Sequence, residues 1–140
     1  MKKLSVASLY VAGVIALLGA LIHVGAILGG VSWYTFFNAP PIVVASARAG
    51  TWLAPISAGF IAMLMALCAA YAFSALGLLR RLPLPRLMLG GMAFICLLRA
   101  FILLPLSINH PELRNTFEVL AAIVWGLAGV GFFFGWRQAD

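Results

Sequence analysis

Carboxylate side chains are almost absent from this sequence. Among its 140 residues only Glu112, Glu118 and Asp140 are acidic, and Asp140 is the last residue printed. General acid–base catalysis needs correctly placed proton-exchanging groups, and no pair of carboxylates can be assembled from these three. The H-E-x-x-H, G-x-S-x-G and glycine-rich phosphate-binding motifs are also missing. The sequence therefore does not indicate an enzyme.

Charged residues of both signs are scarce, and so is cysteine. Charged side chains make up 9% of the chain and hydrophobic ones 65%, with a mean hydropathy of +1.14. A soluble domain carries about 25% charged residues, so a water-facing surface cannot be built from this composition. The two cysteines, Cys68 and Cys96, lie inside apolar runs and form no C-x-x-C motif. A disulfide framework is therefore not expected, and lipid is the expected solvent.

Four apolar runs are long enough to cross a bilayer as helices, which takes about 20 residues. They cover residues 4–28, 52–79, 87–108 and 116–136. The runs lack the alternating pattern of membrane β-strands. Short connections make sequential helices antiparallel neighbours. We therefore expect an all-α membrane protein, with residues 1–140 forming a single transmembrane domain built as an antiparallel four-helix bundle.

Basic residues are distributed unevenly around these four runs. Six of them fall on one side of the expected bundle and two on the other: Lys2, Lys3, Arg80, Arg81, Arg86 and Arg137 against Arg48 and Arg114. Because Lys and Arg stay on the cytoplasmic side, both termini are expected in the cytoplasm, as in a protein of the bacterial inner membrane. The net charge of +6 thus reflects topology and contact with lipid rather than nucleic-acid binding.

The segment between the first two runs, residues 29–51, differs from the other connections. It contains Trp33, Tyr34, Phe36 and Phe37, and such aromatic rings sit at head-group depth. Prolines at 40 and 41 can open a short helix that Gly50 closes. We expect an interfacial helix on the outer face. It could serve as a lid over a site between the long helices, or as an anchor lying on the membrane.

Small residues recur along the expected spans and favour close helix packing in lipid. The second span carries an unbroken four-residue series: Ala54, Ala58, Ala62, Ala66 and Ala70. The first span has Ala12, Ala16 and Ala20, and the fourth has Gly131 and Gly135. We expect the Ala54–Ala70 series to face another helix. One of these faces could instead form a homodimer or contact another membrane protein.

Arg99 interrupts the third apolar run and is the main candidate for a functional residue. A charge near the membrane centre costs about 2.5–3.5 kcal/mol and usually finds a partner inside the protein. Glu118 is the only acidic residue in or beside another span, and His23 lies at a similar depth. The three could line an outer-half pocket, together with Arg48 and Trp52, that binds or moves a small or lipid-like ligand, whose anionic group Arg99 could hold. Alternatively, Arg99 and Glu118 form a structural pair.

No cofactor is favoured by the sequence. Haem would need histidines on facing helices, and His110 lies beside Pro111 in a connection. Copper could use the series Met88, Met92 and Cys96, but such residues are ordinary packing groups. Two alternatives to a ligand-binding protein therefore stay open: a structural or accessory subunit of a larger membrane complex, and a haem or quinone redox subunit.

The segments SWYTFF, GTWLAPI and LLRAFILLPL resemble a loose group of small bacterial inner-membrane proteins with four predicted spans. The resemblance covers most of the chain and implies the same four-span topology. It implies no substrate.

Overall fold

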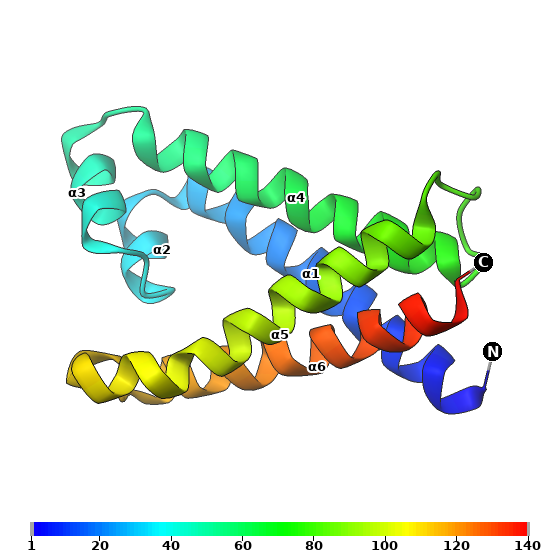
Figure 1. Cartoon of the computed structure of the whole chain (residues 1–140). Helices are drawn as coiled ribbons and strands as arrows, with labels where there is room; N and C mark the ends of the chain where they lie inside the picture. The colour runs from blue at the N-terminus through cyan, green and yellow to red at the C-terminus, as the bar shows by residue number, and fades with distance from the viewer. Residues whose placement is uncertain (1, 140) are drawn as a thin grey trace. The chain divides into compact units, whose positions relative to one another are not determined.

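The computed structural model describes residues 2–139, and these residues form helices joined by short connections (Figure 1). The four long helices are α1 (Lys3–Gly29), α4 (Leu53–Ala75), α5 (Pro85–Asn109) and α6 (Thr116–Gln138). Each is long and apolar enough to cross a membrane. The expected all-α fold with four long apolar helices packed as a bundle is therefore confirmed.

The chain divides into two compact units, one made of residues up to 16 with those from 68 onward, and one made of residues 17–67. In the first unit the beginning of α1, the end of α4, α5 and α6 share one apolar core. Leu9, Leu89 and Phe132 are its largest fully buried side chains. Helices α5 and α6 form an antiparallel hairpin (Figure 1). This hairpin carries the charged pair described below.

Glycine allows α6 to approach α1 closely in the first unit. A Cβ atom built on Gly131 would overlap the backbone carbonyl oxygen of Ser8. One turn further along α6, a Cβ on Gly135 would lie 3.0 Å from Leu9 Cδ1. Both glycines are buried, so these small residues of the fourth span lie against α1 rather than on an exposed face.

The alanine series of α4 faces the protein only in part. Ala54, Ala58 and Ala62 are buried, whereas Ala66 is exposed and Ala70 is half-buried. A four-residue step advances by about 400°, so each alanine lies about 40° further around a helix of 3.6 residues per turn. After three steps, at Ala66, the series has left the buried face, and Ala69 is buried instead. The expectation that the whole series packs against a helix was wrong for Ala66.

The connection between α4 and α5 is fixed by side chains near the end of α4. Ser74 Oγ donates a hydrogen bond to Arg80 O (3.0 Å) and accepts one from Leu82 N (3.0 Å). Tyr71 Oη donates to the carbonyl oxygen of Pro83 at 3.0 Å. These bonds hold an irregular connection after Ala75, so α4 ends before Leu79, the end expected from the apolar pattern.

The second unit places two short helices between α1 and α4. They are α2 (Val31–Phe36) and α3 (Pro41–Ala49). The expected start of α3 at the prolines and its end at Gly50 are confirmed, and Gly50 has the left-handed conformation, with φ of 69°. Helix α2 was not expected. It follows Gly30, whose positive φ of 69° turns the chain out of α1.

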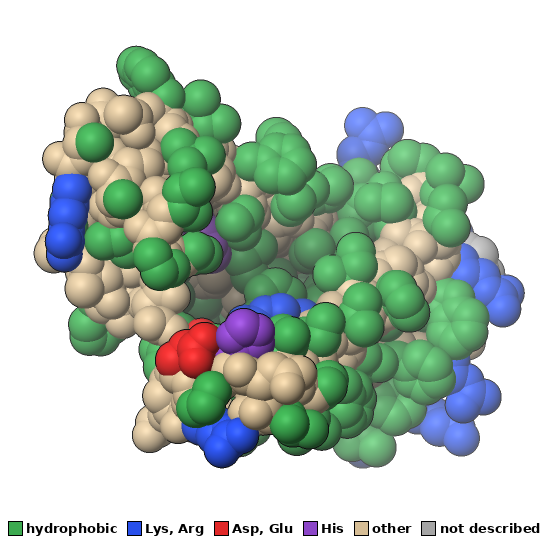
Figure 2. All heavy atoms as spheres, turned by 60° about the vertical axis from the view of Figure 1, so that its left-hand side comes forward, with side chains coloured by type: hydrophobic (Ala, Val, Ile, Leu, Met, Phe, Trp, Pro, Cys, Tyr) green, Lys and Arg blue, Asp and Glu red, His purple; other side chains and the backbone are tan. Residues whose placement is uncertain are grey.

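The long helices present large apolar side chains outward. Figure 2 shows hydrophobic side chains over much of the visible surface. Exposed examples come from all four long helices: Leu21, Phe60, Phe94, Phe101 and Ile123. Water-soluble monomers rarely expose contiguous apolar surface on this scale, whereas lipid accommodates it. We therefore treat the protein as a multi-pass membrane protein.

Candidate functional site

The structure brings Arg99 and Glu118 together within the α5–α6 hairpin. Arg99 Nη2 donates a hydrogen bond to Glu118 Oε2 at 3.3 Å. Arg99 lies ten residues before Asn109, the last residue of α5, whereas Glu118 lies in the first turn of α6. Both side chains are long, so they meet although Arg99 lies well inside α5 and Glu118 lies at the beginning of α6.

Glu118 is held by its position at the N-terminus of α6. Asn115 is the N-cap of this helix, and its Oδ1 accepts a hydrogen bond from Glu118 N at 2.9 Å. A carboxylate in the first turn is stabilised by the positive end of the helix dipole. The Glu118 side chain is only 10% exposed. Its negative charge is thus supported by the helix end and by Arg99.

Arg99 is less completely satisfied than Glu118. A guanidinium has five N–H donors, and in the described residues 2–139 Arg99 makes the single hydrogen bond to Glu118. Its side chain is 40% exposed. A guanidinium near the middle of an apolar helix is costly in lipid, so its remaining N–H groups require water or an acceptor. Arg99 can therefore accept an anionic group while it keeps its contact with Glu118.

His23, Arg48 and Trp52 lie in the second unit. His23 Nδ1 lies 2.7 Å from the carbonyl oxygen of Gly19, one turn earlier in α1. This local contact satisfies one ring nitrogen within its own helix. Trp52, in the connection before α4, is 76% exposed. Of the three residues, Arg48 is the one that lines a groove.

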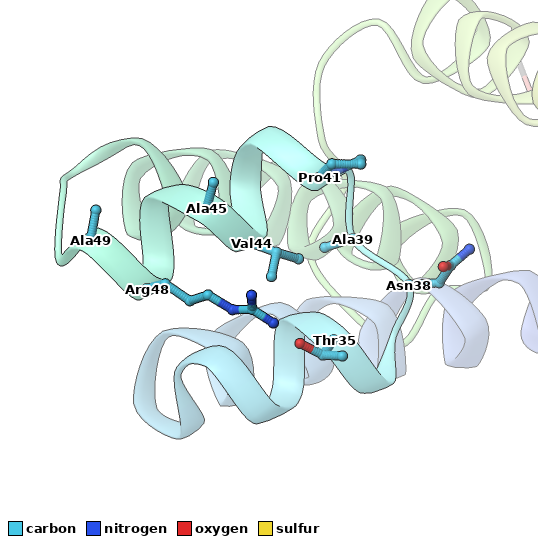
Figure 3. A pocket seen from close by; sticks show the side chains of 8 residues that line it. All are labelled: Thr35, Asn38, Ala39, Pro41, Val44, Ala45, Arg48 and Ala49. Atoms are coloured by element: carbon cyan, nitrogen blue, oxygen red, sulfur yellow. The ribbon is translucent and has the colours of Figure 1, made fainter.

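The groove lies between α2 and α3 and has a volume of about 660 Å³. Figure 3 shows Arg48 extending from α3 toward Thr35 of α2. Besides Arg48, the polar residues that line the groove are Thr35 and Asn38. The other lining residues are small or apolar: Ala39, Pro41, Val44, Ala45 and Ala49. Thr35 and Asn38 were not among the site residues expected from the sequence. Their three-residue spacing among aromatic residues was the available clue.

A hydrogen-bonded corner joins α3 to the beginning of α4. The buried Ser46 Oγ lies 2.6 Å from Thr51 Oγ1 and accepts a hydrogen bond from Ala54 N at 3.0 Å. Thr51 N also donates to the carbonyl oxygen of Ser46 at 3.0 Å. Ser46 thereby satisfies one of the free N–H groups at the beginning of α4. The corner fixes the α3 side of the groove.

Helices α2 and α3 together form a short helical hairpin, the α2–α3 hairpin. Tyr34 of α2 lies in the apolar core next to it. Its side chain packs in a cluster with Ala26, Ala54 and Ala58, and Val44 contributes both to this cluster and to the groove. Tyr34 is 6% exposed, and within residues 2–139 its hydroxyl has no hydrogen-bond partner. Burial raises the pKa of the Tyr34 hydroxyl.

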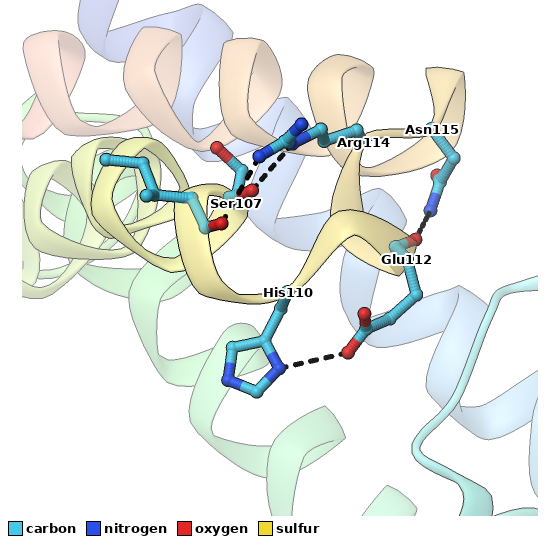
Figure 4. Close-up of polar contacts among 6 residues, drawn as sticks. Ser107, His110, Glu112, Arg114 and Asn115 are labelled. Carbon is cyan, nitrogen blue, oxygen red and sulfur yellow. Dashed lines mark hydrogen bonds and ion pairs between the residues drawn. The ribbon is translucent and has the colours of Figure 1, made fainter.

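The connection between α5 and α6 contains a second polar pair, which is exposed (Figure 4). His110 Nδ1 lies 3.0 Å from Glu112 Oε1. The pKa of Glu112 is lowered, first by a hydrogen bond from its own backbone and then by one from His110. Arg114 donates to the carbonyl oxygens of Ser107 (2.6 Å) and Ile108 (3.3 Å), where it closes the end of α5. These contacts organise the connection.

The sulfur-containing residues belong to the apolar core of the first unit. Met92 and Cys96 are buried there, and Met88 and Cys68 pack against the same cluster. Within residues 2–139 no group of three His, Cys, Asp or Glu side chains is placed to hold a metal ion. The two cysteines are not bonded to each other.

Comparison with family models, with curated proteins and with solved structures finds no match to this chain. The four-span organisation of the group it resembles is present, but no family is identified.

Proposed function

We propose that this multi-pass membrane protein binds or moves a small, lipid-like anion, with Arg99 as the anchor and Glu118 as its counter-charge. The proposal rests on the partial exposure of Arg99 and on its unused hydrogen-bond donors. Its side chain is 40% exposed, and four of its five N–H donors are unused within residues 2–139. A planar guanidinium recognises carboxylate or phosphate through two parallel hydrogen bonds.

The pair with Glu118 suits a site that binds reversibly. In the absence of ligand, Glu118 neutralises Arg99 and keeps it ordered. When an anion binds, Glu118 keeps the local charge close to neutral, because it remains supported by Asn115 and the N-terminus of α6. With both termini in the cytoplasm, as the basic residues favour, this pair lies in the outer half of the membrane.

Identification of co-purified molecules tests the proposal. Wild-type protein in mild detergent is expected to retain an anionic species visible by native mass spectrometry, and the Arg99→Leu/Glu118→Leu double variant is expected to lack it. The matched control is His110→Gln/Glu112→Gln, which removes the exposed pair of the same hairpin. Retention of the same species by the Leu/Leu variant would assign the Arg99–Glu118 pair to structure, as in an accessory subunit.

A further inference from the structure

Arg48 is the only formally charged residue in the second unit. Residues 17–67 contain no other Lys or Arg and no Asp or Glu. Arg48 therefore has no carboxylate partner within its own unit, and its positive charge has to be balanced from outside it. This distinguishes Arg48 from Arg99, which has Glu118.

The position of Arg48 suits an anion of moderate size. It lies in the groove of about 660 Å³ between α2 and α3, which falls within the range of small-molecule sites. Figure 3 shows its side chain extending from α3 toward α2, with the guanidinium on the side of Thr35. The neighbouring Val44, Ala45 and Ala49 are small or apolar and leave room for a head group.

The hairpin around the groove is strongly apolar on its exposed surface. Phe36 of α2 and Ile42 of α3 are large, exposed and uncharged, and Trp33 of α2 is also exposed. Aromatic rings of this kind favour the boundary between head groups and acyl chains. A lone cation beside exposed apolar side chains matches a molecule with a negative head and hydrocarbon tails.

We propose that the groove between α2 and α3 binds the phosphate of an anionic glycerophospholipid. Arg48 donates hydrogen bonds to the phosphate, and the acyl chains lie along the exposed apolar side chains of the hairpin. The head-group site shares no residue with the Arg99–Glu118 pair, so each site can fail independently of the other.

Hydrogen exchange in nanodiscs tests this site directly. Full-length protein is placed in phosphatidylglycerol or in phosphatidylcholine, and amide exchange is followed over residues 35–49. Exchange there is expected to be about fivefold slower in phosphatidylglycerol, the effect of one basic residue on an anionic lipid. Equal exchange in the two lipids would overturn the proposal without any variant being needed.

Two substitutions and one competing anion test whether Arg48 causes the slower amide exchange in phosphatidylglycerol. Arg48→Gln is expected to abolish the difference in amide exchange rate between the two lipids. Arg48→Lys is expected to reduce that difference, because lysine binds phosphate as a point charge. The matched control Arg81→Gln, in the connection after α4, is expected to leave it unchanged. Persistence of the lipid effect in Arg48→Gln would contradict the assignment. Equal protection by inorganic phosphate in phosphatidylcholine would assign the groove to a free anion instead of a lipid.

Discussion

Gly131 of α6 lies so close to Ser8 of α1 that a methyl group at position 131 would overlap the Ser8 carbonyl oxygen. The obstacle is backbone, so it cannot be relieved by rotation of a side chain. The first unit therefore depends on a residue without a Cβ atom at this crossing.

We expect Gly131→Ala to lower the free energy of unfolding by at least about 2 kcal/mol, because the two helices must separate. Thermal or denaturant unfolding in detergent measures the change. Gly91→Ala is the matched control, since a Cβ there meets no atom within 4 Å. It should gain about 0.5–1 kcal/mol from higher helix propensity. Similar stability of the two variants would show that the α1–α6 crossing is looser than described.

The buried and exposed alanines of α4 give a second comparison. Ala62→Leu is expected to destabilise the protein by about 1–3 kcal/mol, because Ala62 is buried and the larger side chain overpacks the helix contact. Ala66→Leu, one step along the same series, is expected to be close to neutral, because Ala66 is exposed. Melting temperatures in detergent distinguish them. A reversed order would place the lipid-facing side of α4 at Ala62.

Coupling between Arg99 and Glu118 is measurable by a double-mutant cycle. Arg99→Leu and Glu118→Leu are each expected to lower the free energy of unfolding by about 1–3 kcal/mol, less than for a fully buried pair because Arg99 is partly exposed. Arg99→Leu/Glu118→Leu should be more stable than either single variant. Additive effects would mean that the two side chains do not interact in the folded protein.

The exposed pair in the α5–α6 connection predicts a local dependence on pH. The pKa of Glu112 is lowered in the folded protein. Its ionised carboxylate therefore stabilises the connection at pH values above the usual pKa range of glutamate. This contribution is lost as the pH falls through the lowered folded pKa. Carboxyl NMR should give a titration midpoint below about 4.3, the value of an unperturbed glutamate. His110→Gln should raise the midpoint only in part, because the backbone hydrogen bond is the larger cause. A midpoint at the ordinary value would exclude these contacts in solution.

Topology is testable with reporter fusions. The six-to-two distribution of basic residues predicts that a reporter after Asp140 is cytoplasmic and that one inserted between residues 109 and 115 is on the other side. Reporters that indicate the same side at both positions would be incompatible with α6 crossing the membrane.

The elements that the sequence predicts well are those determined locally. Runs of apolar residues locate the four long helices to within a few residues, and the proline and glycine at positions 41 and 50 mark the ends of α3. The end of α4 was misplaced because Ser74 and Tyr71 bond to residues far along the connection. Such bonds have no counterpart in an apolar pattern.

The candidate sites likewise include one contact that the sequence predicts and one groove that it does not. Scarcity of acidic residues made Glu118 the natural partner for Arg99, and the structure shows their contact. The groove at Arg48 was harder to anticipate, because it depends on α2 and on how α2 meets α3. Rotation of each helix about its axis also decided whether Ala66 faced protein or lipid. The spacing of residues along the sequence determines which of them share a face of one helix. It does not determine which neighbouring helix, or the lipid, that face meets.

The Ser46 corner has a consequence for how any ligand would reach the groove. Because Ser46 is bonded to Thr51 and to Ala54 N, α3 cannot swing about residues 50–52 without exposing a helix end and breaking these bonds. The bonds of Ser46 thus attach α3 firmly to the beginning of α4. A molecule that binds beside α3 therefore meets a helix whose attachment to α4 is already ordered, and little conformational entropy of that attachment is lost on association.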